Sequence, residues 1–136
     1  MDIQALINEY TVWLRQEIRF EKAGDHYEIT TPFLDDANDH IQFYVRSDGE
    51  MIHFTDDGYT INQLIMSGVK MDKARRKSLS LLLQRYGVGI EGDELTTKTD
   101  VRGFPKRKHL YIQAIMRVAD MAGQSDSRIR TSFPSV

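Results

Sequence analysis

The sequence predicts an α+β fold in which helices pack against an antiparallel sheet, and three observations support this class. Residues 2–22 carry apolar side chains at steps of three and four, which is the period of an amphipathic helix. Much of residues 27–55 alternates apolar and polar side chains, which is the period of a half-buried strand. Residues 73–121 return to the helical period on either side of a short hairpin. We therefore expect an N-terminal helix, a three-stranded antiparallel sheet, helices, a small hairpin and a C-terminal helix packed on the sheet.

Capping residues mark the ends of the predicted helices. Asp2, Thr60 and Asp72 can each accept hydrogen bonds from the first-turn N–H groups of the helix that follows. Glycine follows three of the predicted helices, as is typical of helix C-termini. The helices are expected at residues 2–22, 60–67, 73–86 and 106–121.

Three strands are expected between the first two helices, at residues 27–31, 40–46 and 51–55. Pro32 should end the first strand, because proline cannot donate to the hydrogen-bond ladder. Asp48 and Gly49 lie between the other two. Asp-Gly between alternating segments is the strongest short-range signal for a hairpin with a two-residue type I′ turn.

A two-residue turn at this point would fix the register of the hairpin. Tyr44 would lie opposite His53, and His40 would lie opposite Asp57. The apolar face, which should form the core, would carry Ile41, Phe43, Val45, Ile52 and Phe54. The polar face would carry His40, Gln42, Tyr44, His53, Thr55 and Asp57.

The length and composition of the chain limit what kind of protein it is. Its 136 residues fit one α+β domain at residues 1–123, followed by a flexible polar tail at residues 124–136. It has no cysteine, which excludes disulfides and thiolate metal sites. The sequence has no signal peptide and no run of about 20 apolar residues that could span a membrane. We therefore expect a cytoplasmic protein without a membrane partner.

Charge is distributed unevenly along the chain. Residues 1–68 contain 13 acidic and 4 basic residues, a net charge of −9, whereas residues 69–136 contain 7 acidic and 14 basic residues, a net charge of +7. Such asymmetry is typical of proteins that bind a polyanionic partner or associate with themselves as a homodimer. It also occurs in domains whose two halves simply neutralise each other.

Acidic and histidine side chains gather at one end of the predicted hairpin. Asp39 and His40 stand where the second strand begins, and Asp56 and Asp57 stand where the third ends. Carboxylates at a strand end can hold Mg²⁺ or Mn²⁺, which would activate water for phosphodiester cleavage with His40 or His53 assisting. The histidines with Asp57 could instead hold zinc or form an acid–base pair. The alternative interpretation is turn and cap chemistry, together with a solvated strand face. The order of elements resembles restriction-endonuclease-like nucleases, but the lysine of their motif is absent from the third strand.

Two clusters of basic residues lie at the starts of predicted helices. A helix N-terminus adds donors and a favourable dipole for phosphate, so the clusters could grip a nucleic-acid backbone without reading its sequence. The alternative is that they are ordinary solvated helix faces. The first cluster is Lys70, Lys73, Arg75, Arg76 and Lys77, and the second is Arg102, Lys106, Arg107 and Lys108.

Six short segments of the chain occur in an order that is typical of one family. They are Thr31-Pro32-Phe33-Leu34-Asp35, Asn38-Asp39-His40-Ile41-Gln42, Thr55-Asp56-Asp57-Gly58-Tyr59-Thr60, Ser67-Gly68, Tyr86-Gly87-Val88 and Gly92-Asp93-Glu94-Leu95. Over about residues 25–122 the chain resembles the family named domain of unknown function 1828 (DUF1828). The resemblance implies a small protein of bacteria, prophages and other mobile elements, many of which act on host defence. It implies no catalytic residues.

These features together favour a non-catalytic interaction protein of phage or mobile-element type. We expect an anti-defence inhibitor, such as an anti-CRISPR protein, that binds a host effector protein or nucleoprotein complex of the restriction or CRISPR kind. No cofactor is expected for that function. Two alternatives stay open: a metal-dependent nuclease that uses Mg²⁺ or Mn²⁺, and a regulator that binds nucleic acid through the basic clusters.

Overall fold

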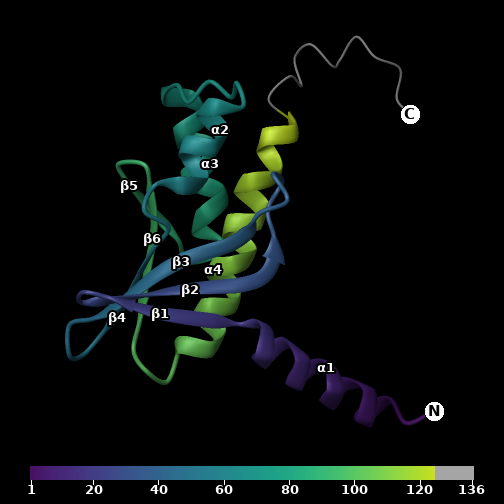
Figure 1. Ribbon diagram of the computed structural model, residues 1–136. Helices are drawn as coiled ribbons and strands as arrows, with labels where there is room; N and C mark the ends of the chain where they lie inside the picture. The colour runs from purple at the N-terminus through teal and green to yellow at the C-terminus, as the bar shows by residue number, and fades with distance from the viewer. Residues whose placement is uncertain (125–136) are drawn as a thin grey trace.

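The structure is a computed structural model that describes residues 1–124 of the chain. Figure 1 shows how the elements are arranged. The helices are α1 (Ile3–Glu17), α2 (Tyr59–Met66), α3 (Lys73–Gln84), α4 (Phe104–Ala119) and the short 3-10 helix η1 (Asp120–Gln124). The strands are β1 (Arg19–Ala23), β2 (His26–Leu34), β3 (His40–Ser47), β4 (Ile52–Thr55), β5 (Gly89–Glu91) and β6 (Glu94–Thr99). The predicted tail lies outside the described residues from residue 125 onward.

All of these strands pair in one antiparallel sheet, in the order β1-β2-β3-β4-β6-β5. The α+β class is confirmed, but the prediction of a three-stranded sheet is wrong, because six strands take part. The small hairpin expected near the C-terminal helix is β5–β6, and it joins the sheet through pairing of β6 with β4.

Strand β1 lies within the stretch that the apolar period assigns to the first helix. Helix α1 ends at Glu17, and Ile18 then takes an extended backbone with φ −85° and ψ 123°. The chain continues as β1, which pairs with β2. Because Ile18 also fits the apolar stripe of α1, periodicity alone does not separate the two elements.

Strand β2 continues through Pro32, so the prediction that this proline ends the strand is wrong. The register between β2 and β3 shifts between Thr30 and Leu34, which places Pro32 in an irregularity of the ladder where a missing N–H is tolerated. The hydroxyl group of Thr31 donates to the carbonyl oxygen of Ile41 at 3.0 Å and accepts from the N–H of Phe33 at 3.2 Å. These bonds hold the irregular segment against β3.

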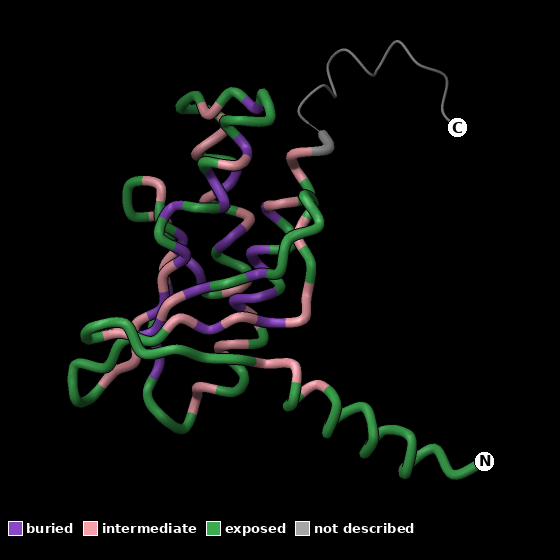
Figure 2. The backbone as a smooth tube through the Cα atoms, viewed as in Figure 1, coloured by how far each residue is buried: buried purple, intermediate pink, exposed green. Residues whose placement is uncertain are grey.

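The predicted apolar face of the β3–β4 hairpin forms the core. Phe43 and Phe54 are buried and stack with ring centroids 5.6 Å apart. Tyr111 of α4 packs edge-on against both rings, at 5.4 and 5.3 Å. Its hydroxyl group donates to the carbonyl oxygen of Leu95 at 2.6 Å, and burial raises the pKa of Tyr111 well above its ordinary value. Helix α4 therefore covers this face of the sheet, where the buried residues concentrate (Figure 2).

Two of the three predicted helix caps are confirmed. Asp2 and Asp72 each accept from the backbone N–H group three residues ahead, at 3.1 and 2.8 Å. Thr60 is not the cap of α2, because that helix begins at Tyr59. Its N-cap is Gly58, whose left-handed φ of 81° favours glycine.

Helix α1 projects away from the sheet and the other helices, and none of its residues is buried (Figures 1 and 2). Among the helices of residues 1–124, none has both the length and the apolar character needed to cross a membrane.

The hydroxyl group of Tyr111 tests the packing of α4 on the sheet. Tyr111→Phe leaves the carbonyl oxygen of Leu95 without this donor in a buried place, and should lower the free energy of unfolding by about 1–2 kcal/mol. Urea denaturation measures the change, and Tyr27→Phe at an exposed position controls for loss of a hydroxyl group. Equal losses in both variants would contradict the buried hydrogen bond.

Candidate functional site

The turn between β3 and β4 contains four residues, 48–51, and not two. Tyr44 therefore pairs with Thr55, and Arg46 pairs with His53. The prediction that Tyr44 lies opposite His53 is wrong. The observed pairing is shifted by two residues from the predicted pairing, so each side chain still lies on the face of the sheet that the alternation predicts.

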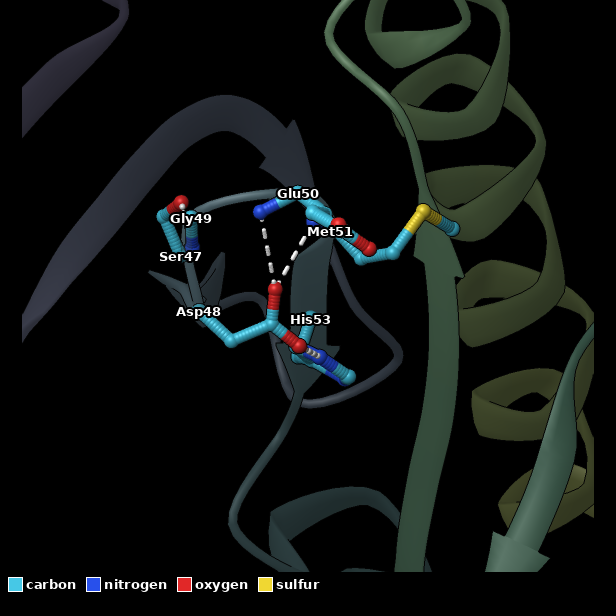
Figure 3. Close-up of polar contacts among 6 residues, drawn as sticks. All are labelled: Ser47, Asp48, Gly49, Glu50, Met51 and His53. Atoms are coloured by element: carbon cyan, nitrogen blue, oxygen red, sulfur yellow. Dashed lines mark hydrogen bonds and ion pairs between the residues drawn. The ribbon is translucent and has the colours of Figure 1, made fainter.

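The side chain of Asp48 is the reason for the longer turn (Figure 3). Its Oδ1 atom accepts from the N–H groups of Glu50 and Met51, at 3.1 and 2.8 Å. The Oγ atom of Ser47 accepts from the N–H group of Gly49 at 3.1 Å. Side chains that bond neighbouring backbone groups in this way offer an alternative to the two-residue hairpin turn.

The same carboxylate also contacts the histidine that the sequence marks as a candidate. Asp48 Oδ2 lies 2.8 Å from Nε2 of His53 (Figure 3). The hydrogen bond with His53, followed by those from the backbone of Met51 and Glu50, holds the pKa of Asp48 far below its ordinary value. His53 is thus held by the turn, in a fixed orientation on β4.

A row of basic side chains crosses three strands beside this turn. Arg46 on β3 pairs with His53 on β4, and His53 pairs with Lys98 on β6. Val45 and Phe54, their neighbours in sequence, point into the core. Because successive side chains of a strand point to opposite faces, the row lies on the face of the sheet away from α4.

A hollow of about 690 Å³ lies along this uncovered face, and Gly87 and Arg107, a member of the second predicted basic cluster, also line it. The row Arg46, His53 and Lys98 lines it, together with Tyr44 and His26. The rings of His26 and Tyr44 meet edge to face, with centroids 5.5 Å apart. Burial, with the charges of nearby carboxylates, raises the pKa of Tyr44, so its phenol stays protonated at neutral pH. The acidic residues of the lining are Asp57, Glu91 and Glu94.

Asp56, a candidate catalytic residue, has a structural role. Its carboxylate is buried, and three backbone N–H groups donate to it. Oδ1 accepts from Gly58 at 3.0 Å and from Leu95 at 2.9 Å, and Oδ2 accepts from Thr60 at 2.9 Å. The side chain therefore joins the end of β4 to α2 and β6.

The other members of the predicted acidic site lie in separate surroundings. Asp39 Oδ2 accepts from the hydroxyl group of Tyr59 at 3.1 Å, and His40 Nδ1 lies 2.8 Å from the carbonyl oxygen of Thr31. His40 pairs with β2 and not with Asp57. Asp57 stands at a left-handed φ of 58° on the rim of the hollow.

In residues 1–124, no group of three or more His, Cys, Asp or Glu side chains is placed to hold a metal ion. Asp39, His40, Asp56 and Asp57 thus do not come together as one cluster in this structure, and the Mg²⁺ or Mn²⁺ site stays a prediction.

The two predicted basic clusters do not form one surface. Helix α3, which carries the first cluster, begins near the end of the molecule where α4 finishes, and the second cluster is at the start of α4 (Figure 1). Arg76 forms an ion pair with Asp93 at 2.7 Å. Arg107 donates to the carbonyl oxygen of Tyr86 at 3.1 Å, and burial lowers the pKa of Lys108. Several of these cations thus serve the fold.

Arg46 and Lys98 are lining residues that the sequence patterns do not single out. Lys98 belongs to a hairpin whose place in the sheet is not encoded locally. The alternation of Leu95 and Thr97 with polar neighbours is a signal that could have marked it, since it predicts that Lys98 faces away from the core.

The family comparison agrees with the resemblance seen in the sequence. The family model described as "Domain of unknown function DUF1828" matches residues 31–118. These residues include β3, β4, β6 and α4, which build the hollow and cover the opposite face of the sheet. No curated protein and no solved structure matches the chain.

Substituting Asp56 should destabilise the fold. Asp56→Asn keeps the size of the side chain but places an NH₂ group where a backbone N–H donates, which should lower the free energy of unfolding by about 2 kcal/mol or more. Asp57→Asn is the matched control at the exposed neighbouring position, and should change it by less than about 0.5 kcal/mol. Urea denaturation of both variants provides the measurement. A stable Asp56→Asn protein would show that the three hydrogen bonds are not needed.

The low pKa of Asp48 predicts a pH dependence. A carboxyl group with a lowered pKa in the folded state stabilises that state above its unfolded pKa, about 3.9, and the effect is lost as pH falls further. The wild-type protein should therefore be more stable than Asp48→Asn at pH 7, and the difference should shrink below about pH 4. Denaturation curves across this range measure the difference, with Asp36→Asn as the control for loss of one exposed charge. A difference that stays constant down to the acid limit would contradict this role of Asp48.

Proposed function

The chain belongs to the DUF1828 family of domains of unknown function, and we propose that it is a non-catalytic binding protein that uses the uncovered face of its sheet to recognise a host effector complex that handles nucleic acid. The observation that carries this proposal is the hollow of about 690 Å³ over the row Arg46, His53 and Lys98.

The lining of the hollow favours a macromolecular partner over a small molecule. Sites for small ligands are usually enclosed and mostly apolar, with a few polar groups that fix orientation. This lining is mostly polar, and its charged side chains Arg46 and Lys98 are exposed. Polar and charged groups around an aromatic ring, here Tyr44, are typical of contact surfaces between proteins.

The mixture of charges favours a protein surface over nucleic acid alone. A phosphate backbone attracts Arg46, Lys98 and Arg107, but it is repelled by Asp57, Glu91 and Glu94 in the same lining. A protein can present both charges in matching positions, which directs association and excludes incorrect partners. The mobile-element context that the family resemblance implies supports a restriction or CRISPR complex as the effector.

The arrangement of the carboxylates supports a function without catalysis. Asp56, which a nuclease would need as a metal ligand, already accepts three backbone hydrogen bonds. Asp39 accepts from Tyr59. Neither is free to rearrange without loss of these contacts.

The proposal predicts that the protein relieves host defence through the hollow. In phage plating on bacteria that carry defined restriction or CRISPR systems, expression of the wild-type chain should raise plaque numbers at least about tenfold for one class of system. Arg46→Glu with Lys98→Glu should abolish this effect, because the reversed charges repel the matched groups of the effector. Lys77→Glu with Arg102→Glu makes the same change of charge at exposed positions outside the hollow, and should keep the effect.

Two outcomes would overturn the proposal. One is loss of the effect in the control variant but not in the hollow variant. The other is cleavage of labelled DNA or RNA that requires Mn²⁺ and is lost in Asp57→Asn, which would establish the nuclease alternative.

A second candidate function is direct binding of single-stranded nucleic acid by the same face. The observation in its favour is the row of basic side chains next to the aromatic ring of Tyr44, since grooves for single strands combine such cations with stacking platforms. If it holds, binding weakens steeply with salt, and Arg46→Glu with Lys98→Glu makes the salt dependence shallower. Unshifted DNA and RNA at low salt would exclude this candidate.

A further inference from the structure

Helix α1 presents a stripe of large apolar side chains to solvent. Ile3, Leu6, Tyr10 and Trp13 are 59, 47, 55 and 49% exposed. No residue of α1 is buried, and the helix stands apart from the sheet (Figure 2). The helix lies outside both the hollow and the residues matched by the family model, so a role for this stripe does not rest on the proposed function.

The stripe has the repeat of a helix that packs along another helix. Its apolar side chains fall at the same three positions in two successive heptads, first Ile3, Leu6 and Ile7, then Tyr10, Trp13 and Leu14. Spacings of three and four residues that sum to seven keep one seam facing a partner helix along its length. The opposite side of α1 is polar apart from Ala5 and Val12, and there Gln4 donates to Asn8 at 3.0 Å.

A helix with such an exposed apolar stripe needs a partner surface that packs against the stripe. Isolated helices of about 12–15 residues are marginally stable in water, and most helical stability in proteins comes from packing of an amphipathic face. Helix α1 has 15 residues, and only its C-terminal end approaches the body, through the half-buried Leu14 and Ile18. Two aromatic side chains in the stripe, Tyr10 and Trp13, stack with centroids 6.2 Å apart, and both residue types are enriched among the strongest contacts of protein interfaces.

The dipole of α1 favours a second copy of this chain as the partner. Two copies in antiparallel orientation place the positive N-terminal end of each helix beside the negative C-terminal end of the other. A membrane surface fits less well, because helices that lie on membranes carry Lys and Arg on the polar face, whereas α1 carries Glu9 and Glu17.

The exposed area is sufficient for such a dimer. A large apolar side chain has roughly 150–250 Å² of surface, so five that are about half exposed present on the order of 500 Å². Two copies would bury about 1,000 Å², which is the lower bound for a specific interface. Phe20 on β1, which is 74% exposed, can add to this area. The free edge of the sheet at β1 is a poorer contact, because Arg19, Glu21 and Lys22 are charged and such residues block edge pairing.

We propose that α1 is a dimerisation helix, which pairs in antiparallel orientation with α1 of a second copy through the stripe Ile3, Leu6, Ile7, Tyr10, Trp13 and Leu14. In this pairing Leu6 packs beside Tyr10 of the second copy, and Ile3 packs beside Trp13 of the second copy. The two sheets are then held at opposite ends of a helical pair, with both hollows open.

The oligomeric state tests the proposal directly. Sedimentation of the full chain at micromolar to sub-millimolar concentration should give twice the 15.7 kDa mass of one chain. Leu6→Glu should weaken the dimer at least about tenfold, because it places a charge in the apolar seam. Asn8→Glu introduces the same charge on the polar side of the same helix, and should leave the dimer intact. Because Leu6 and Asn8 are both exposed in the single chain, the urea unfolding of the core should be alike in both variants.

A monomer over the whole concentration range would overturn the proposal, and so would a dimer that survives Leu6→Glu. A monomer that binds vesicles of phosphatidylcholine and phosphatidylglycerol through α1 would assign the stripe to a membrane surface instead.

The absence of cysteine from the chain makes the orientation testable. Ile3→Cys and Trp13→Cys proteins, mixed in equal amounts and oxidised, should form a covalent dimer faster than either protein alone, because a disulfide needs neighbouring Cα atoms within about 7 Å. Rapid cross-linking of Ile3→Cys with itself would indicate a parallel pair and overturn the antiparallel arrangement.

Discussion

The buried carboxylate of Asp56 is the interaction on which the core and the candidate site both depend. It accepts from the N–H groups of Gly58 and Thr60 where α2 begins, and from that of Leu95 in β6, 39 residues later in the chain. A charge buried in this way is tolerated only when hydrogen bonds replace its water. The contact with Leu95 lies at the end of the β4–β6 pairing, which brings Lys98 beside His53 and completes the basic row.

The uncovered face depends on a second polar contact, that of Asp48. By accepting from the backbone of Glu50 and Met51, this side chain lengthens the β3–β4 turn and displaces the pairing by two residues. An even displacement preserves which side chains face the core and changes only which side chains are neighbours across the strands. The apolar face was therefore predicted correctly, whereas the neighbour of His53 on β3 is Arg46 and not Tyr44.

The two faces of the sheet have different roles. One face is covered by α4 and holds the stacked rings of Phe43, Phe54 and Tyr111. Within residues 1–124 no helix covers the other face, which borders the wide hollow with its mostly polar lining. In the proposed dimer, recognition uses this second face, while α1 brings two copies together without covering it. Both proposed roles, recognition of a partner and dimerisation, require binding and not catalysis. This agrees with a structure in which carboxylates of the candidate site hold the backbone.

The sequence by itself determined the local elements. The spacing of apolar residues predicted the helices and three of the strands, and the alternation of side chains predicted which face of the hairpin is buried. Asp2 and Asp72 marked helix starts, because the distance from a capping side chain to the N–H group three residues ahead depends on the local backbone alone. Only the tertiary structure decided that six strands share one sheet, that Lys98 joins His53, that Asp56 is structural and that most of α1 stands apart from the rest of residues 1–124. These outcomes depend on contacts between segments that are distant in the sequence, such as that of Asp56 with Leu95. The local spacing of apolar and polar residues does not indicate which distant strand will supply the hydrogen-bond partner.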